Sequence, residues 1–220
     1  MKHRNLPNQI TMGRLLLSVV FFALLSVCHV RPVPNRGLLL ACFVIYIVAG
    51  LTDILDGYLA RRWKVTSAFG RIADPFVDKV IVCGAFALLA GRNFVYPAGG
   101  DGVLDQIPAW LPDWLHGGMA SAVQGWMVVV LIGREFIVSG IRGFSESQGL
   151  AFPATPAGKA KMLIQSVAIC TILYQLAFVP AAWAVLLKIS LVWLTVIATV
   201  VSGLAYVGRA RQLLLEATRG

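Results

Sequence analysis

The sequence predicts an all-α integral membrane protein that forms a single domain over residues 1–220, with six transmembrane helices. Composition is the first observation behind this prediction, because 58% of the residues are hydrophobic and only 13% are charged. Soluble domains carry about 25% charged residues. The second observation is a series of apolar runs, each close to the roughly 20 residues that span the hydrocarbon core of a bilayer.

The apolar runs give the expected positions of the six transmembrane helices. They cover residues 13–30, 37–60, 73–91, 125–145, 159–179 and 183–207. Ahead of them, residues 1–12 carry Lys2 and Arg4 and predict a short helix lying at the membrane surface. We do not expect a cleaved signal peptide, because the apolar run that follows is long and no small-residue cleavage site precedes an external domain.

The longest connection between the expected spans covers residues 92–124. It is rich in glycine and proline, and it carries Trp110 and Trp114. Tryptophan is enriched at membrane surfaces. We therefore expect this segment to lie at the external surface, where nothing in its residues calls for a binding partner.

The positive residues indicate how the spans are oriented. The chain carries 19 Lys and Arg residues against 10 Asp and Glu, a net charge of +9. Basic residues are enriched in cytosolic segments of membrane proteins. A cytosolic N-terminus leaves only four basic residues outside, namely Arg31, Arg36, Arg92 and Lys188. This distribution predicts that both termini are cytosolic. Nucleic-acid binding is not expected, because the chain has no long basic run or groove-binding motif.

Four aspartates stand inside or beside apolar sequence at helical spacing. Asp53 and Asp56 are three residues apart, and Asp74 and Asp78 are four residues apart, so each pair lies on one helix face. Each charge at membrane depth costs roughly 2.5 to 3.5 kcal/mol and needs a compensating partner. Carboxylate oxygens suit Mg²⁺, Mn²⁺ or Ca²⁺ rather than zinc. The four aspartates therefore predict a metal site at the cytosolic face.

Small residues flank these acids. Gly57, Ala60 and Gly70 leave room for a ligand against the helix backbones, because they carry little or no side chain. Arg61 adds a guanidinium that can donate two hydrogen bonds to phosphate oxygens. The stretch therefore predicts a site for both a metal and a phosphate group.

Together these residues form the pattern Asp53-x2-Asp56-Gly57-x2-Ala60-Arg61-x8-Gly70-x3-Asp74-x3-Asp78. By this pattern the chain resembles the CDP-alcohol phosphatidyltransferase family. The resemblance implies a membrane enzyme of phospholipid synthesis that uses two Mg²⁺ or Mn²⁺ ions and forms homodimers. It implies that all four aspartates hold the metal and that Asp78 is also the catalytic base. It further implies that the CDP group is contacted by Thr52, Gly57, Ala60, Arg61 and Gly70.

A second group of charged residues is predominantly basic. Arg134, Glu135 and Arg142 interrupt one apolar run, and Lys159 and Lys161 open the next. Four positive charges exceed what one carboxylate neutralises, so we expect an anionic ligand here. Forked arginine contacts and a mobile lysine would suit the phosphate of a phosphorylated alcohol. The alternative is cytosolic topology alone, with these residues facing anionic lipid headgroups.

The resemblance extends over nearly the whole chain. Residues 5–14, 134–142 and 158–161 look like the family members that use glycerol 3-phosphate as acceptor, although Met162 stands where a threonine is expected. The implied reaction joins glycerol 3-phosphate to the phosphatidyl group of CDP-diacylglycerol, at the cytosolic face of a bacterial inner membrane. Inositol phosphate, serine and phosphatidylglycerol remain alternative acceptors. A six-span transporter is a further alternative, but its acids would be spread along a path through the membrane.

Overall fold

In the residues that it describes, the computed structural model of this chain contains helices joined by turns and loops, with one isolated β-bridge and no β-strand. It describes the backbone of residues 6–30, 34–63, 68–96, 107, 110–147 and 156–217. Side chains are described for residues 12–30, 34–53, 76–96, 107, 110–145, 147 and 156–210. The elements are α1 (Leu6–Val27), α2 (Arg36–Trp63), α3 (Ala68–Leu89), η1 (Arg92–Phe94), α4 (Asp113–His116), α5 (Gly125–Ser147), α6 (Pro156–Phe178) and α7 (Ala182–Ala217).

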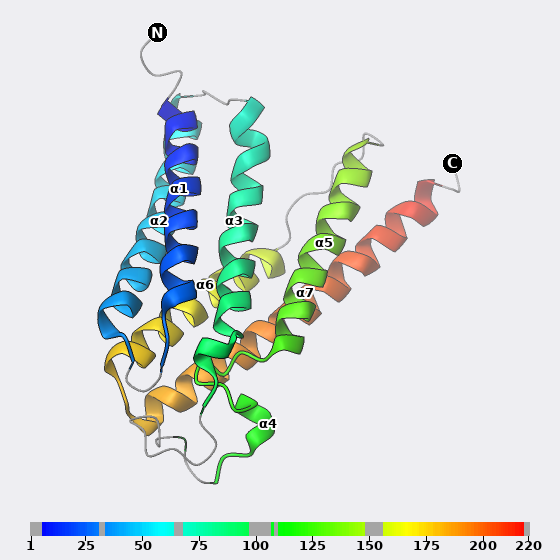
Figure 1. The fold of residues 1–220 in the computed structure, drawn as a ribbon. Helices are drawn as coiled ribbons and strands as arrows, with labels where there is room; N and C mark the ends of the chain where they lie inside the picture. Colours follow the sequence, from blue (N-terminus) through cyan, green and yellow to red (C-terminus); the bar gives the residue numbers. More distant parts are fainter. Residues whose placement is uncertain are drawn as a thin grey trace.

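The six long helices run up and down in turn, so α1 begins and α7 ends at the same end of the bundle (Figure 1). Helices α1, α2 and α3 pack together on one side, and α5 packs against α7 on the other. Helix α6 joins the two groups because it packs against both α2 and α7. This arrangement brings the C-terminal ends of α2 and α5, the second and fourth predicted spans, to the same end of the molecule (Figure 1).

The core is formed by aliphatic and aromatic side chains from all six long helices. Phe21, Leu39, Phe86, Leu131 and Ile169 are among the fully buried ones. Large apolar side chains are also exposed along the outer faces of the same helices. Such extensive apolar exposure indicates a surface that contacts another apolar phase, here the lipid of a membrane.

Three helices of the described chain are long and apolar enough to cross a membrane, namely those containing Arg36–Asp53, Pro156–Phe178 and Ala182–Ala210. The apolar part of α1, Met12–Val27, is shorter. Charged residues lower the hydropathy of α3 and α5. Helix α3 carries Arg71, Asp74, Asp78 and Lys79, and α5 carries Arg134, Glu135, Arg142 and Glu146. The predicted all-helical membrane architecture is therefore confirmed, while six spans and the side on which the termini lie stay predictions.

The N-terminal segment differs from expectation. A separate surface helix over residues 1–12 was expected, but residues 6–12 form the first turns of α1, which continues unbroken to Val27. Pro7 does not interrupt this helix because proline is tolerated in the first turn, where backbone N–H groups have no intrahelical acceptor. Residues 1–5 lie outside the described chain.

The connection between α3 and α5 packs onto the end of the bundle opposite the start of α1 (Figure 1). Val95 forms an isolated antiparallel bridge with Met119, and His116 is buried, which lowers its pKa. Lys188 of α7 is fully buried and donates to the Ala120 carbonyl at 2.5 Å and to Gln175 Oε1 at 2.8 Å. Lys188 therefore attaches the described part of residues 92–124 to α7 and also links α7 to α6.

Candidate functional site

One buried arginine joins two of the predicted metal ligands. Arg14 lies on α1 and is only 3% exposed. Its Nη1 is 2.6 Å from Asp53 Oδ1 on α2, and its Nη2 donates to Asp78 Oδ1 on α3. The guanidinium therefore holds together carboxylates that are 25 positions apart in sequence, and three helices meet at this point. We call Arg14, Asp53 and Asp78 the acidic centre.

The acidic centre fits a divalent cation through the chemistry of its donors. Two carboxylates face a single guanidinium, so the three described groups carry a net negative charge. Hard oxygen donors of this kind suit Mg²⁺ or Mn²⁺. No cluster of three or more metal-ligating side chains occurs among the described residues. The side chains of Asp56 and Asp74 lie outside that part of the chain.

The predicted CDP contacts are covered only in part. Thr52 is half-buried on α2, and its Oγ1 donates to the Val48 carbonyl of the same helix at 2.7 Å. The other four predicted residues belong to α2 and α3, but their side chains lie outside the described residues. They are Gly57, Ala60, Arg61 and Gly70.

An apolar cavity of about 460 Å³ opens beside the acidic centre. It lies between α1, α2, α3 and α6, and its lining includes Arg14, Asp53 and Asp78. Most of its remaining lining is apolar, and Met162 and Leu163 of α6 contribute to it. A cavity with charged groups beside an apolar interior suits an amphipathic ligand with a polar headgroup and hydrocarbon chains.

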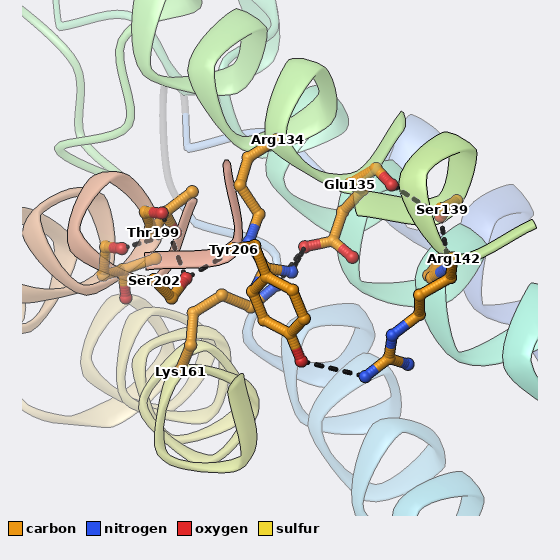
Figure 2. A network of polar contacts seen from close by, with 10 residues as sticks. Arg134, Glu135, Ser139, Arg142, Lys161, Thr199, Ser202 and Tyr206 are labelled. Atoms are coloured by element: carbon orange, nitrogen blue, oxygen red, sulfur yellow. Dashed lines mark hydrogen bonds and ion pairs between the residues drawn. The ribbon is translucent and has the colours of Figure 1, made fainter. Parts of the chain in front are cut away.

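The predicted anion site is formed where α5, α6 and α7 meet. Figure 2 shows Glu135 accepting from Arg134 and Lys161 at the centre of the network. The Arg134 Nη1 to Glu135 Oε1 distance is 3.1 Å, and Lys161 Nζ donates to the same oxygen. Arg134 Nε also donates to Ser202 Oγ on α7 at 3.2 Å.

Tyr206 connects the second arginine to this network. Arg142 Nη2 donates to the Tyr206 hydroxyl at 2.8 Å (Figure 2). The guanidinium carbons of Arg134 and Arg142 lie 5.3 and 5.4 Å from the centre of the Tyr206 ring, within the range of cation–π attraction. We call Arg134, Glu135, Arg142, Lys161 and Tyr206 the basic centre.

Two donors of the basic centre lack acceptors within the described residues. Arg134 Nη2 and Arg142 Nε are both buried and without a hydrogen-bond partner in that part of the chain. An unsatisfied buried donor costs about 1 to 3 kcal/mol, and more for a charged group. Buried polar groups of this kind call for an acceptor, and an anionic oxygen would satisfy them.

Lys159 is the predicted anion ligand that the structure leaves outside the basic centre. It is exposed, and it makes no ion pair with any other described residue. Lys161 is buried at 2% exposure. The difference follows from helix geometry, because residues two positions apart on α6 face different sides.

Residues next to one centre in the chain are linked to the other centre or line the cavity beside it. Lys79 follows Asp78 on α3, and its Nζ donates to Ser139 Oγ on α5 at 2.5 Å. Ser139 Oγ in turn donates to the Glu135 carbonyl at 2.6 Å. On α6, Lys161 of the basic centre precedes Met162, which lines the apolar cavity. Helix α6 therefore contributes both to the lining of the cavity and to the basic centre.

Sequence reasoning assigned no individual role to several residues in or beside these centres. Arg14 belongs to the stretch 5–14 that the resemblance covers and places near the site, and Ser139 lies within the stretch 134–142, but neither was given a role of its own. The remaining three, Lys79, Ser202 and Tyr206, carried no assignment at all. The spacing of Ser202 and Tyr206, four residues apart on one face of α7, is a signal that could have indicated a polar site.

Comparisons with known proteins point to one family. The family model for CDP-alcohol phosphatidyltransferases matches residues 4–201. The chain is similar to the CDP-diacylglycerol–glycerol-3-phosphate 3-phosphatidyltransferase of Bacillus subtilis (strain 168), with 30% identity over 92% of this chain and 93% of the relative. It is 29% identical to the protein of that name from Escherichia coli (strain K12), over 96% of this chain and 98% of the relative. The Rickettsia typhi protein of the same name is 25% identical, over 92% and 95%.

Proposed function

Because the chain belongs to the CDP-alcohol phosphatidyltransferase family, we propose that it transfers the phosphatidyl group of CDP-diacylglycerol to glycerol 3-phosphate. The products would be phosphatidylglycerophosphate and CMP. The relatives that match along almost their whole length carry the name of this reaction. The observation that carries the choice of acceptor is the basic centre, with its two buried guanidinium N–H groups left for an anionic oxygen.

The donor lipid is assigned to the acidic centre and the cavity beside it. Asp53, Asp56, Asp74 and Asp78 would hold Mg²⁺ or Mn²⁺, as two ions. When bound, such ions would neutralise the charge that develops on the diphosphate as its bond to CMP breaks. Thr52, Gly57, Ala60, Arg61 and Gly70 would contact the CDP group. The apolar lining of the cavity suits the acyl chains.

The acceptor is assigned to the basic centre. Arg134, Arg142 and Lys161 would bind the phosphate of glycerol 3-phosphate, with exposed Lys159 adding positive charge at the entrance. Asp78 would accept the proton of the acceptor hydroxyl as that oxygen attacks the lipid-linked phosphorus. The Lys79–Ser139 hydrogen bond between α3 and α5 supports this arrangement, because it ties the helix of the base to a helix of the acceptor site.

The membrane architecture and the bacterial relatives support a proposed setting for the reaction. We place the enzyme in the cytoplasmic membrane of a bacterium as a homodimer, with six spans per chain and both termini in the cytosol. The metal and acceptor sites then face the cytosol, where CMP is released and glycerol 3-phosphate is available. Residues 92–124 would lie at the external surface.

The test is CMP release by the purified protein in detergent with CDP-diacylglycerol and Mg²⁺. Glycerol 3-phosphate, inositol phosphate, serine and phosphatidylglycerol are supplied in separate reactions, with excess EDTA as the metal-free control. We expect release with glycerol 3-phosphate alone, and none with EDTA. Activity only with another acceptor would keep the chemistry and overturn the proposed acceptor. Lack of release with all four would overturn the enzyme assignment.

A further inference from the structure

Tyr206 occupies an unusual position between the two arginines of the proposed acceptor site. It is 1% exposed on α7, although α7 contributes none of the charged residues of that site. Its hydroxyl accepts a hydrogen bond from Arg142, and its ring lies beneath the guanidinium groups of both Arg134 and Arg142 (Figure 2). A single buried side chain thus contacts both groups.

The contacts of Tyr206 restrict side chains that are otherwise mobile. An arginine side chain is long and flexible, so it loses conformational entropy when it is held in one orientation, and two like charges held close together repel each other. The aromatic ring attracts both guanidinium groups, and Ser202 holds Arg134 from the same helix through a bond of 3.2 Å. Both arginines are therefore held in place, and each keeps a buried N–H group with no acceptor among the described residues.

We propose that Tyr206 is a positioning residue of the acceptor site, which holds Arg134 and Arg142 in the orientation that binds the acceptor phosphate. This inference rests on the proposed function, and it adds α7 to the elements that determine acceptor affinity. Tyr206 does not touch the reacting atoms in this account. Its effect is on the binding of the phosphorylated acceptor.

A packing role is the alternative explanation of the same burial. Tyr206 packs in a small apolar cluster of its own with Val138, Ile141 and Ala210. Packing alone would be satisfied by any large apolar side chain, whereas positioning depends on the ring and the hydroxyl. Tyr206→Phe removes only the hydroxyl, and Tyr206→Leu removes the ring as well.

The experiment measures KM and kcat for each substrate in these two variants. Tyr174→Phe is the matched control. Tyr174 lies half-exposed on α6, and its ring contacts are with Phe43 and Phe178, which belong to neither centre. We expect Tyr206→Phe to raise the KM for glycerol 3-phosphate about fivefold and Tyr206→Leu about 30-fold. The KM for CDP-diacylglycerol and kcat stay within about twofold of wild type.

The outcomes separate this inference from the proposed function. Equal changes in both KM values, or a change in kcat alone, would overturn positioning and leave the reaction intact. Activity of the wild type with inositol phosphate instead would overturn the proposed acceptor, while a raised KM for that acceptor in the variants would support positioning. An acceptor without phosphate would overturn both. If Tyr206→Leu does not fold, Tyr206→Phe decides, because it preserves the packing of the ring.

Discussion

The acidic and basic centres are built on the same plan with the charges exchanged. In the acidic centre one buried cation, Arg14, lies between two carboxylates from neighbouring helices. In the basic centre one carboxylate, Glu135, accepts from an arginine and a lysine on α5 and α6. Each centre therefore contains one counter-ion of its own, and each retains an excess of one sign. In the proposed function that excess would be the charge available to a ligand, a metal cation in one case and a phosphate in the other.

The two centres differ in what holds their side chains in place. An aspartate has a short side chain, so the positions of Asp53 and Asp78 follow closely from the backbones of α2 and α3. Arginine and lysine side chains are long and flexible, and the basic centre needs Ser202 and Tyr206 on a further helix to orient them. An acidic site can thus be specified by spacing along two helices, whereas a basic site requires partners from elsewhere in the fold.

The largest effect that would test this comparison is expected at Asp78. Asp78→Asn retains the size of the side chain but removes its capacity to accept the acceptor proton, together with the negative charge that faces Arg14 and the proposed metal. General-base catalysis contributes about 10²- to 10⁴-fold, so we expect CMP release to fall about 10³-fold. The measurement is kcat with saturating glycerol 3-phosphate and CDP-diacylglycerol.

The control for that substitution is Asp113→Asn, which removes an equal charge from a fully exposed acid on α4. This control should release CMP at the wild-type rate. If Asp78→Asn keeps more than about a tenth of wild-type activity, Asp78 is not the base. The carboxylates of the acidic centre would then serve only to bind the metal.

A smaller effect is expected at Arg142 in the basic centre. Arg142→Gln removes a charge-assisted donor to the acceptor phosphate, a contribution of about 1.5 to 3 kcal/mol for hydrogen bonds to charged groups. The KM for glycerol 3-phosphate should rise about 10- to 100-fold, while the KM for CDP-diacylglycerol stays near its wild-type value. Arg142→Lys should recover part of the loss, because it restores the charge without the planar donor fork.

Arg209→Gln is the charge-matched control for Arg142→Gln, because Arg209 is exposed on α7. It should leave both KM values unchanged. If Arg142→Gln raises the KM of both substrates equally, the two centres do not bind separate ligands, and the comparison between them fails.

The sequence indicated the aspartates of the acidic centre but not the partners that hold the side chains of the basic centre. The aspartates of α2 and α3 were predicted because their helical spacing is a local property of the chain. The partners of the basic centre are remote, since Tyr206 is 64 positions from Arg142 and Ser202 is 68 positions from Arg134. Only the packing of α5 against α7 brings them together, and no spacing rule relates them.

The fold shows the same division between local and remote information. Apolar runs predicted where the six long helices lie, because hydrophobicity is a local property of the chain. They did not predict all the ends, since α7 continues past residue 207 to Ala217. The break between residues 12 and 13 was wrong, since the polar residues before it continue the helix of α1. The pairing of Arg14 with two aspartates could not be predicted, because it depends on how three helices pack.

The smallest effect concerns the counter-ion of the acidic centre. Arg14→Gln leaves Asp53 and Asp78 without their shared cation, so their mutual repulsion should destabilise the metal-free protein. Removing one partner of a buried ion pair costs about 3 to 5 kcal/mol, and Asp53 is partly exposed, with 41% of its side chain accessible, which reduces the cost. We therefore expect the unfolding temperature in EDTA to fall by about 5 °C, against no change in Arg36→Gln, which removes an exposed arginine from the start of α2.

The effect of Mg²⁺ on the unfolding temperature shows whether Arg14 acts as a counter-ion or only packs in the core. Arg14 and a divalent cation would neutralise the same two carboxylates, so Mg²⁺ should raise the unfolding temperature of Arg14→Gln by more than that of wild type. Titration with Mg²⁺ in the absence of both substrates gives this difference without reference to activity. Equal Mg²⁺ stabilisation in the two proteins would mean that the guanidinium and the metal use different oxygens. In that case Arg14 would not be the counter-ion that a metal replaces, and the comparison of the two centres would fail for the acidic centre.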